Sequence, residues 1–364
     1  MGKKLITSSS SLAGFFKGKK VLITGHTGFK GSWLAEILCQ WGADVVGLAL
    51  PPHTQPSMYE VLQLDQKVKT YTVDIRDFEK VLDVFHKEKP EIVFHLAAQA
   101  IVKLSYDDPL KTYSTNVLGT ANVLQAIRQT SSIKSAVIIT SDKAYKNVEW
   151  VYPYRETDVL GGHDPYSASK SSADIVVQSF IYSFFSEQKP PFIAITRAGN
   201  VIGGGDWSPN RIIPDIIRAV YSQKKPVIIR SPNAIRPWQF VLEPLSGYLM
   251  LAQKLYEGES RFMSEWNFGP SDENFVPVLS LMENGVKILG KGTFKIVPDK
   301  ELKEATLLKL DISKAKSLLG WHPALNFSQT MEFTFSWYKC FYEQPKKISQ
   351  FTRQQIVNFF ELMK

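Results

Sequence analysis

The chain has 364 residues, of which 44% are hydrophobic, 12% aromatic and 21% charged, so disordered, collagen-like and coiled-coil classes are excluded. A single hydrophobic core stops growing at about 250–300 residues, and we therefore expect two lobes. The formal net charge of +8 favours anionic partners, but the basic residues are scattered. This pattern fits a small phosphorylated ligand or a mildly basic surface, and we expect no nucleic-acid partner.

Residues 1–17 carry a serine run in place of a continuous apolar segment, and they are predicted to form a flexible tail rather than a signal peptide. No stretch approaches the roughly 18 to 20 uninterrupted apolar residues of a membrane helix, so we expect no membrane association. The two cysteines, Cys39 and Cys340, indicate no disulfide framework, which fits a reducing cytoplasm.

From residue 20 onward, short apolar runs rich in β-branched residues alternate with helix-like segments. The strands are expected at 21–24, 44–48, 68–73, 92–94, 136–139 and 192–195, with helices that include 31–41, 107–130 and 166–187. These strands lack strict polar alternation, as strands covered on both faces do. The pattern predicts an α/β fold, a doubly wound parallel Rossmann sheet over residues 18–199.

After about residue 200 the regular alternation ends. Three consecutive glycines and several prolines are followed by isolated elements, helix-like at 213–222 and 244–257, strand-like at 227–230, and a further element at 307–319. Residues 200–364 are predicted to form a smaller, irregular α/β lobe that binds the substrate, and part of 236–260 is expected to return to the Rossmann domain.

A glycine-rich loop directly follows the first strand and opens into a helix; its sequence is Gly25-His26-Thr27-Gly28-Phe29-Lys30-Gly31. Three glycines at this spacing permit a tight turn, a close approach of the backbone to a pyrophosphate and close helix packing. The N–H groups at the helix start attract phosphates. The context predicts a dinucleotide site rather than a simple turn. His26 and Lys30 are candidates to reach the phosphates or the ribose, and the alternative for Lys30 is a solvated surface.

The acidic residue expected about 20 residues further on, where it would bind the ribose diol of NAD, is missing from Leu48-Ala49-Leu50-Pro51-Pro52. No arginine stands there for the 2′-phosphate of NADP either, so NAD is the expected cofactor. Asp74, after the third strand, is interpreted either as an acceptor for the adenine amine or as a helix N-cap. The remaining cofactor-binding candidates follow the third and fourth strands: Ile75, Leu96, Ala97 and Ala98.

Tyr166 and Lys170 are four residues apart, so they share one face of a helix. A tyrosine with a pKa near 10 is a poor base at neutral pH, and a nearby ammonium, joined by a positive nicotinamide ring, stabilises its phenolate. Ser141, Asp142 and Lys143 follow the fifth strand, at the edge where such folds bind ligands. Ser141 is predicted to align the reacting hydroxyl. The alternatives are a polar strand end for Ser141 and a solvated turn for Asp142 and Lys143.

Together these residues resemble those of the extended short-chain dehydrogenases/reductases that act on nucleotide sugars, the NAD-dependent epimerase/dehydratase family. Within it they are most similar to the CDP-glucose 4,6-dehydratases, through the segments 25–33, 141–143, 161–170, 197–207 and 236–239. The resemblance spans about Phe15 to about Tyr338. It implies a cytoplasmic NAD-dependent lyase that converts CDP-glucose or a similar nucleotide sugar to the 4-keto-6-deoxy sugar. It also implies a homodimer through helices 107–130 and 166–187, and a place in deoxysugar biosynthesis for lipopolysaccharide O-antigens.

The resemblance also implies a role for each residue of the site. Tyr166 takes the proton of the sugar 4-hydroxyl while hydride leaves C4 for NAD, and the resulting ketone acidifies C5. Asp142 is expected to protonate the departing 6-hydroxyl, and Lys143 to remove the C5 proton or to assist that base electrostatically; hydride then returns to C6. The dTDP-glucose dehydratases have an Asp-Glu pair here, and this chain departs from them at Lys143.

Four residues are candidates for substrate binding. By resemblance Arg236 and Asn200 contact the pyrophosphate, Arg211 is a second arginine suited to it, and Gln99 is a candidate contact to the hexose. The alternatives are surface ion pairs for the arginines and a loop amide that satisfies backbone groups for Gln99. We expect no metal site, since the sequence has no HExxH, no paired CxxC and no carboxylate cluster.

Two other functions are weighed. One is a related nucleotide-sugar epimerase, reductase or dehydratase acting on another hexose; an acid/base pair directly after Ser141 is unusual in the epimerases and reductases. The other is a non-catalytic dinucleotide sensor, which is expected to have lost Tyr166 or Lys170. Both residues are present.

Overall fold

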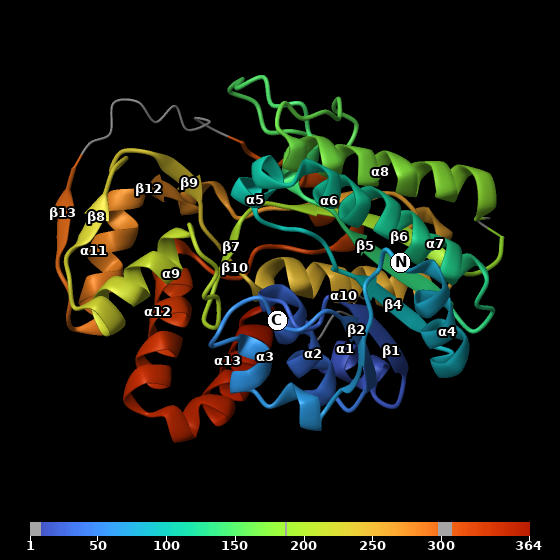
Figure 1. The fold of residues 1–364 in the computed structure, drawn as a ribbon, viewed down its shortest axis with the longest axis horizontal. Helices are drawn as coiled ribbons and strands as arrows, with labels where there is room; N and C mark the ends of the chain where they lie inside the picture. Colours follow the sequence, from blue (N-terminus) through green and yellow to red (C-terminus); the bar gives the residue numbers. More distant parts are fainter. Residues whose placement is uncertain (1–8, 186–187, 298–307) are drawn as a thin grey trace, which may run out of the picture.

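A seven-stranded parallel sheet forms the centre of the computed structural model, which describes residues 9–185, 188–297 and 308–364 (Figure 1). Its order is β11-β6-β5-β4-β1-β2-β3. The strands are β1 (Lys20–Thr24), β2 (Asp44–Ala49), β3 (Lys69–Thr72), β4 (Ile92–His95), β5 (Ser135–Ile139), β6 (Phe192–Ala198) and β11 (Glu265–Phe268). The strand order reverses between β1 and β4, because β2 and β3 lie on one side of β1 while β4, β5 and β6 lie on the other. Doubly wound folds bind their ligands at such a point. The predicted fold class is confirmed.

The seventh strand, β11, was not predicted from the sequence. It pairs with β6, with Glu265 opposite Ile195 and Phe268 opposite Ala198. The four residues of β11 include a glutamate and an asparagine, so no apolar run marks them as a strand. Pairing with a distant part of the chain decides this element.

Two groups of helices cover the two faces of the sheet. The helices α4 (Phe78–Glu88), α7 (Gly119–Arg128) and α8 (Pro165–Phe184) pack over one apolar cluster. On the other face lie α2 (Phe29–Gln40) and α10 (Leu242–Tyr256), whose core continues into the C-terminal lobe. Helix α10 comes from beyond residue 200 and packs against β5 and β6. Among the described residues, no helix is both long and apolar enough to cross a bilayer.

The predicted helix over 107–130 is present from Pro109 onward, with one irregular turn. A separate short helix, α5 (Val102–Asp107), ends before it, and Asp108 then caps α6 (Pro109–Tyr113) by accepting the N–H of Lys111. A π-helical turn at Ser114–Leu118 joins α6 to α7. The break falls at residue 108 because proline is favoured at the first helical position and disfavours a helical residue before it.

The C-terminal lobe contains short two-stranded pairings and separate helices, on the left in Figure 1. The pairs are β7 (Val201–Ile202) with β10 (Gln239–Phe240), β8 (Val227–Ile229) with β13 (Phe294–Ile296), and β9 (Ile235–Pro237) with β12 (Phe275–Pro277). The helices are α9 (Ile212–Ile217), α11 (Val278–Leu289), α12 (Phe327–Glu343) and α13 (Ile348–Leu362), and π-helical turns occupy Arg218–Gln223 and Ala315–Leu319. The predicted start of the last element, residue 307, lies outside the described residues. One further short helix, α3 (Met58–Val61), lies near the glycine loop in the N-terminal part of the chain.

The predicted N-terminal tail is wrong from residue 9. Helix α1 (Ser9–Phe16) is formed there, and Leu12 and Phe16 are buried in the core. The ring of Phe16 stacks on Trp41 at a centroid distance of 6.0 Å. Residues 1–8 of the expected tail lie outside the described residues. Local propensity did not predict this helix, because burial of its aromatic side chains against distant parts of the chain stabilises it.

A buried carboxylate joins α10 to the segment before α12. Glu243 accepts the backbone N–H groups of Ala324 and Leu325 at 3.1 and 2.8 Å. Burial raises the pKa of Glu243 from 4.5 to about 7, against the effect of those two hydrogen bonds. The folded protein therefore binds this proton more tightly than the unfolded chain does.

This raised pKa predicts a pH dependence of stability. As pH rises from about 4.5 to about 7, the unfolded chain releases the proton of Glu243 first, so the folded state loses on the order of 3 kcal/mol of stability. We expect Glu243→Gln to flatten this loss in urea unfolding between pH 5 and 7.5. The control Glu361→Gln, at an exposed site, should keep the wild-type slope. Equal slopes in both variants would contradict the prediction.

Candidate active site

The glycine loop after β1 has the geometry of an anion-binding turn. Gly25 has a φ of 77°, and a Cβ there would lie 2.7 Å from the backbone nitrogen of Ala97. A Cβ at Gly31 would lie 2.2 Å from the carbonyl oxygen of Gly25. Gly28 is the N-cap of α2, and no side chain caps that helix end. The first N–H groups of α2 are therefore left for an anionic ligand.

The tightest of these positions gives a stability prediction. Gly31→Ala places a methyl group against the backbone of the loop, so we expect a loss of about 1–3 kcal/mol in the free energy of unfolding and weaker dinucleotide binding. Thermal unfolding and a fluorescence titration with the dinucleotide measure the two effects. Gly14→Ala is the control, because a Cβ at Gly14 meets nothing within 4 Å. Wild-type stability and binding in Gly31→Ala would refute the close packing described here.

His26 forms part of the wall of the loop. Its side chain is fully buried, and Nε2 lies 3.0 Å from Oγ1 of Thr70 on β3. Burial lowers the pKa of His26 to about 4, so the ring is neutral at neutral pH. Thr27 donates its hydroxyl to the carbonyl of Leu50 at 2.8 Å, and Phe29 is half-buried at the start of α2.

Lys30 lies inside the site, and the solvated-surface alternative for it is wrong. Its ammonium is 5.8 Å from the ring centroid of Tyr248, a buried residue of α10. Burial, followed by the positive charges of Lys170 and Arg211, lowers the pKa of Lys30 to about 8, while Asp142 opposes that shift. The glycine loop thus brings the cationic side chain of Lys30 close to those of Lys170 and Arg211.

The adenine-side candidates lie after β3 and β4. Asp74 is held by Arg76, whose Nη2 donates to Oδ2 at 2.6 Å, and this contact lowers the pKa of Asp74. The alternative that Asp74 caps the next helix is wrong, because Asp77 is the N-cap of α4. Ile75 is buried, and the half-buried segment Leu96, Ala97 and Ala98 follows β4 and approaches the glycine loop at Gly25.

Tyr166 and Lys170 lie on the first two turns of α8, and both are buried. Asp164 caps this helix by accepting the N–H of Ser167, and Pro165 occupies its first turn. Burial raises the pKa of Tyr166 to about 12, although Ser141 and Arg211 lower it. Burial lowers the pKa of Lys170 to about 8. The protein by itself therefore holds a neutral phenol and not the phenolate expected from the pairing with Lys170.

Ser141, Asp142 and Lys143 form a compact turn at the carboxyl end of β5. Ser141 donates its hydroxyl to Oδ1 of Asp142 at 3.0 Å and accepts the N–H of Lys143 at 3.2 Å. Asp142 is buried, and burial raises its pKa, although Lys143 and Ser141 lower it. The solvated-turn alternative is wrong for Asp142, whose raised pKa suits a proton donor; Lys143 is half-buried.

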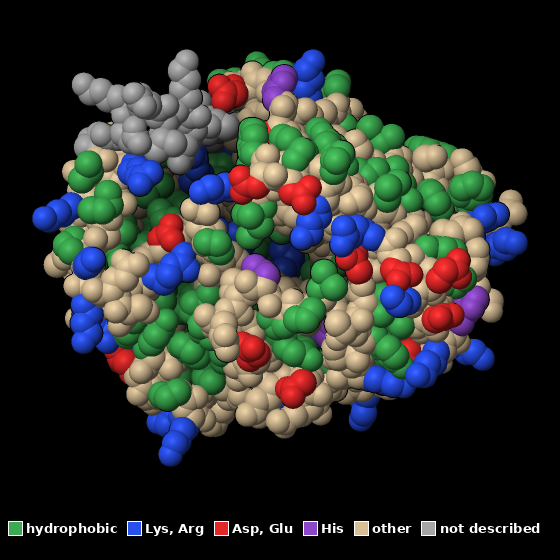
Figure 2. Space-filling model, viewed as in Figure 1, with side chains coloured by type: hydrophobic (Ala, Val, Ile, Leu, Met, Phe, Trp, Pro, Cys, Tyr) green, Lys and Arg blue, Asp and Glu red, His purple; other side chains and the backbone are tan. Residues whose placement is uncertain are grey.

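The substrate candidates are spread over two lobes. Arg211 donates to Oδ2 of Asp206 at 3.1 Å, and its charge acts on both Tyr166 and Lys30. Asn200 is exposed directly after β6, and Arg236 lies half-buried on β9. Figure 2 shows a hollow near the middle of one face, where basic and histidine side chains lie at the opening.

The amide of Gln99 is engaged within its own loop. Its Nε2 donates to Oγ1 of Thr112 at 3.0 Å, and its Oε1 accepts the N–H of Ile101 at 2.6 Å. The backbone N–H of Gln99 also donates to Oδ1 of Asn116 at 2.8 Å. This arrangement matches the alternative of a loop amide that satisfies nearby groups.

Three residues near the site were missed from the sequence. Asp206 binds Arg211, and His53, after β2, places Nε2 3.2 Å from Oγ of Ser208. Tyr248 lies under Lys30, and its side chain is buried. Asp206 follows the three glycines and had a local signal. His53 and Tyr248 had none, because only the fold brings them to the loop.

A family model described as GDP-mannose 4,6 dehydratase matches residues 22–334. The chain belongs to this family. The resemblance to nucleotide-sugar dehydratases is thereby confirmed. Within the family, a CDP-glucose 4,6-dehydratase of Salmonella typhimurium is 48% identical over 330 residues, covering 89% of this chain and 92% of that protein.

Two solved structures share the fold of this dehydratase-family chain. A dTDP-glucose 4,6-dehydratase of Bacillus anthracis, in complex with NAD, aligns with a TM-score of 0.73 at 21% identity, covering 91% of this chain and all of that one, 100%. A UDP-glucose 4-epimerase of Thermotoga maritima with UDP-glucose aligns with a TM-score of 0.71 at 23% identity, covering 88% and 98%. At these identities the likeness concerns the fold.

Proposed function

We propose that the protein is an NAD-dependent CDP-glucose 4,6-dehydratase, which converts CDP-glucose to CDP-4-keto-6-deoxyglucose. The observation that carries this proposal is the buried Asp142 beside Ser141, at the same strand end as Tyr166 and Lys170. An oxidation at C4 needs a base such as Tyr166, and loss of water needs an acid such as Asp142. The 48% identity to a CDP-glucose 4,6-dehydratase over most of the chain supports the choice of nucleotide sugar.

The residues present fit a dinucleotide cofactor, and NAD is the proposed one. The cradle at Gly25 and Gly31, which a Cβ would fill, and the uncapped start of α2 suit a pyrophosphate. Position 50, where a ribose-binding acid is expected, holds a half-exposed leucine. Residues proposed to line the cofactor site are His26, Thr27, Gly28, Phe29, Lys30, Asp74, Ile75, Leu96, Ala97, Ala98, Tyr166 and Lys170. When bound, NAD accepts a hydride from C4 of the hexose and returns it at C6.

The chain's own residues then divide the proton transfers. Tyr166 accepts the proton of the 4-hydroxyl, Ser141 orients that hydroxyl, and the ammonium of Lys170 stabilises the phenolate as it forms. Asp142 donates its proton to the departing 6-hydroxyl, for which its raised pKa suits it. Lys143 is proposed either to take the C5 proton and later return it or to assist that base electrostatically. Arg211, Arg236 and Asn200 are proposed to hold the diphosphate.

The test is incubation of the purified protein with CDP-glucose and NAD. A 4-keto product that absorbs in alkali, without net NADH, is the expected result. Net NADH would indicate a simple dehydrogenase, and an epimerised hexose would indicate an epimerase. Turnover of dTDP- or GDP-glucose in place of CDP-glucose would overturn the assigned nucleotide.

We further propose a homodimer formed through α6, α7 and α8, in the cytoplasm, with a role in the deoxysugar supply of lipopolysaccharide O-antigens. Large apolar side chains on these elements are exposed, Leu110 by 80% and Tyr182 by 83%. Tyr113, Leu118, Ile175 and Phe184 on the same segments are also exposed, and a group of exposed apolar side chains suits an interaction surface. Light scattering of the purified protein tests the dimer, and Leu110→Glu should shift the mass toward a monomer. The two free cysteines, Cys39 and Cys340, fit a reducing compartment.

A further inference from the structure

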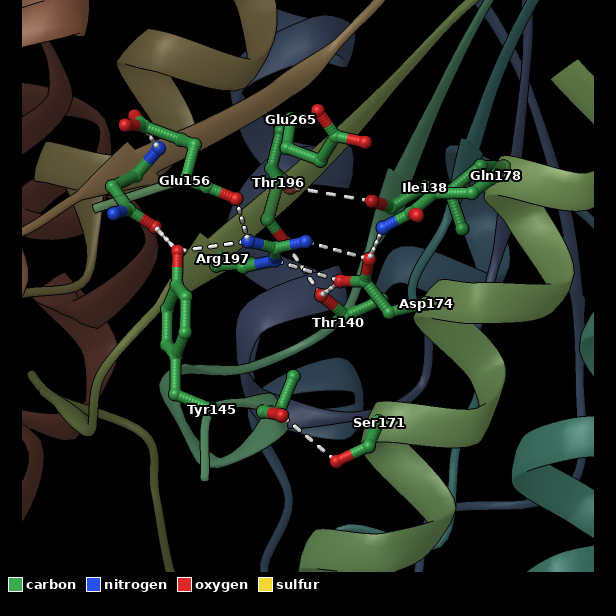
Figure 3. A network of polar contacts seen from close by, with 12 residues as sticks. Ile138, Thr140, Tyr145, Glu156, Ser171, Asp174, Gln178, Thr196, Arg197 and Glu265 are labelled. Carbon is green, nitrogen blue, oxygen red and sulfur yellow. Dashed lines mark hydrogen bonds and ion pairs between the residues drawn. The ribbon is translucent and has the colours of Figure 1, made fainter. Parts of the chain in front are cut away.

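A buried ion pair joins β6 to α8, the helix that carries Tyr166 and Lys170 (Figure 3). The guanidinium of Arg197, on β6, binds the carboxylate of Asp174, on α8, through two hydrogen bonds of 2.8 Å. Their side chains are 1% and 0% exposed. Figure 3 shows Arg197 between Asp174 and Tyr145, whose hydroxyl lies 2.8 Å from Nη1 of Arg197.

This pair connects the two elements that carry the proposed chemistry. Thr140, the residue before Ser141, donates its hydroxyl to Oδ2 of Asp174 at 3.0 Å. One turn earlier on α8, Ser171 donates to the carbonyl of Ala144 at 2.8 Å, in the turn that follows Ser141. Two hydrogen bonds therefore fix α8 against the carboxyl end of β5.

Asp174 also stands one helical turn beyond Lys170, as Lys170 stands one turn beyond Tyr166. Residues four apart on a helix share a face, so the three side chains form one row. The negative charge of Asp174 raises the pKa of Lys170, against the lowering that burial causes. Arg197 binds the same carboxylate from the far side through two hydrogen bonds.

We propose that Asp174 and Arg197 are positioning residues for the catalytic pair, which hold α8 against the end of β5 and keep Lys170 in its ammonium form. The proposal rests on the proposed function for its catalytic meaning. A buried ion pair is weak evidence for stability, since an apolar pair of similar volume often folds as well. A charged pair at this place is explained by what it does to Lys170.

The charged and titratable groups that act with Lys170 come from two elements besides the row on α8. Lys30, from α2, is a further cation, and the charge of Lys170 lowers the pKa of Lys30. His95, at the end of β4, lies between Thr24 and Thr120, and burial lowers its pKa to about 3, so it is neutral. Asp174 is therefore the carboxylate that favours the ammonium form of Lys170.

The test uses three variants of the full chain. Asp174→Asn removes the negative charge, Asp174→Asn with Arg197→Met removes both charges, and Asp174→Glu keeps the charge. Protein labelled with ¹³C at lysine Cε is titrated by NMR, and the Lys170 resonance is assigned by its loss in Lys170→Arg. We expect Lys170 to lose its proton at lower pH in the first two variants and to titrate close to wild type in Asp174→Glu.

Turnover provides the second readout. In the first two variants the alkaline limb of the kcat profile should move to lower pH, so that kcat at pH 8 falls about tenfold while KM for CDP-glucose stays within about twofold. A role in folding alone would lower the amount of active protein and leave the pH profile unmoved.

Two control variants each remove a polar interaction of a buried side chain and keep the negative charge of Asp174. Tyr145→Phe deletes the hydrogen bond to Arg197 and that to Asn267 but leaves the ion pair. Arg353→Met breaks an ion pair of 3.0 Å with the buried Glu36, between α13 and α2. Both should lose stability and keep the wild-type titration of Lys170.

The outcomes separate this proposal from the proposed function. If the wild-type protein does not turn over CDP-glucose, the function fails, and the NMR titration still decides the role of Asp174. An unchanged Lys170 titration in folded Asp174→Asn or in the neutral pair overturns the proposal. If all three variants fail to fold, the pair serves stability alone and the proposal is likewise overturned.

Discussion

Tyr166→Phe is expected to lower turnover of CDP-glucose by about 10³-fold, because the variant has no group to accept the proton of the 4-hydroxyl. Binding of the nucleotide sugar should stay within about twofold of wild type, since the ring still fills its buried position. Steady-state kinetics measure kcat, and calorimetric titration with CDP-glucose measures binding.

The pKa of about 12 at Tyr166 sharpens this prediction. The protein alone holds the phenol neutral, so proton transfer to Tyr166 requires a further positive charge beside it. We therefore expect the phenolate absorbance of the wild-type protein to increase on addition of NAD, and no such increase in Tyr166→Phe. Tyr256→Phe is the control, because its hydroxyl binds Glu91 near the amino ends of the strands. Retained turnover in Tyr166→Phe would refute the role of the phenol.

Asp142→Asn is expected to stop the reaction at a different point. Oxidation at C4 needs no proton from Asp142, so it should continue, while loss of the 6-hydroxyl slows by about 10²-fold or more. Reduced cofactor should accumulate on the enzyme in a single turnover. The absorbance of reduced nicotinamide measures this accumulation. The alkali-absorbing product should form at the slower rate.

The pH profile gives a second measure of Asp142. Burial raises the pKa of Asp142, so its acid form persists to higher pH than that of an ordinary aspartate, and elimination should fall as pH rises through that pKa. The asparagine variant should lack this limb. Asp77→Asn, at the N-cap of α4, is a control that should retain the wild-type rate and profile. Loss of C4 oxidation and elimination by equal factors in Asp142→Asn would show that Asp142 is not a dedicated acid.

Many of the residues of the site were found from the sequence because their signals are local. The loop between Gly25 and Gly31 follows a strand and opens a helix, and Tyr166 and Lys170 are spaced by one helical turn. The turn that contains Ser141 is likewise predicted from its position directly after an apolar strand. Such signals depend on residues within a few positions of each other, which is the range over which strand and helix patterns act.

Two of the missed site residues, His53 and Tyr248, depend on long-range packing. Tyr248 reaches the loop because α10 packs against β5 and β6, and Arg197 meets Asp174 because α8 packs against β6. The seventh strand and helix α1 were missed for the same reason. The pairing partner of β11 is β6, about 70 residues away in the chain, and Phe16 is buried against Trp41 and Phe94.

The sequence by itself determined the doubly wound architecture, the position of the dinucleotide loop and the identity of the catalytic candidates, because each follows from hydrophobic period, glycine spacing or helical spacing. Only the tertiary structure decided the protonation of these groups. The pKa values of Tyr166, Lys170 and Asp142 depend on burial and on charges brought from other elements, such as Lys30 and Arg211. Desolvation is a property of the packed molecule, and no local pattern of residues carries it.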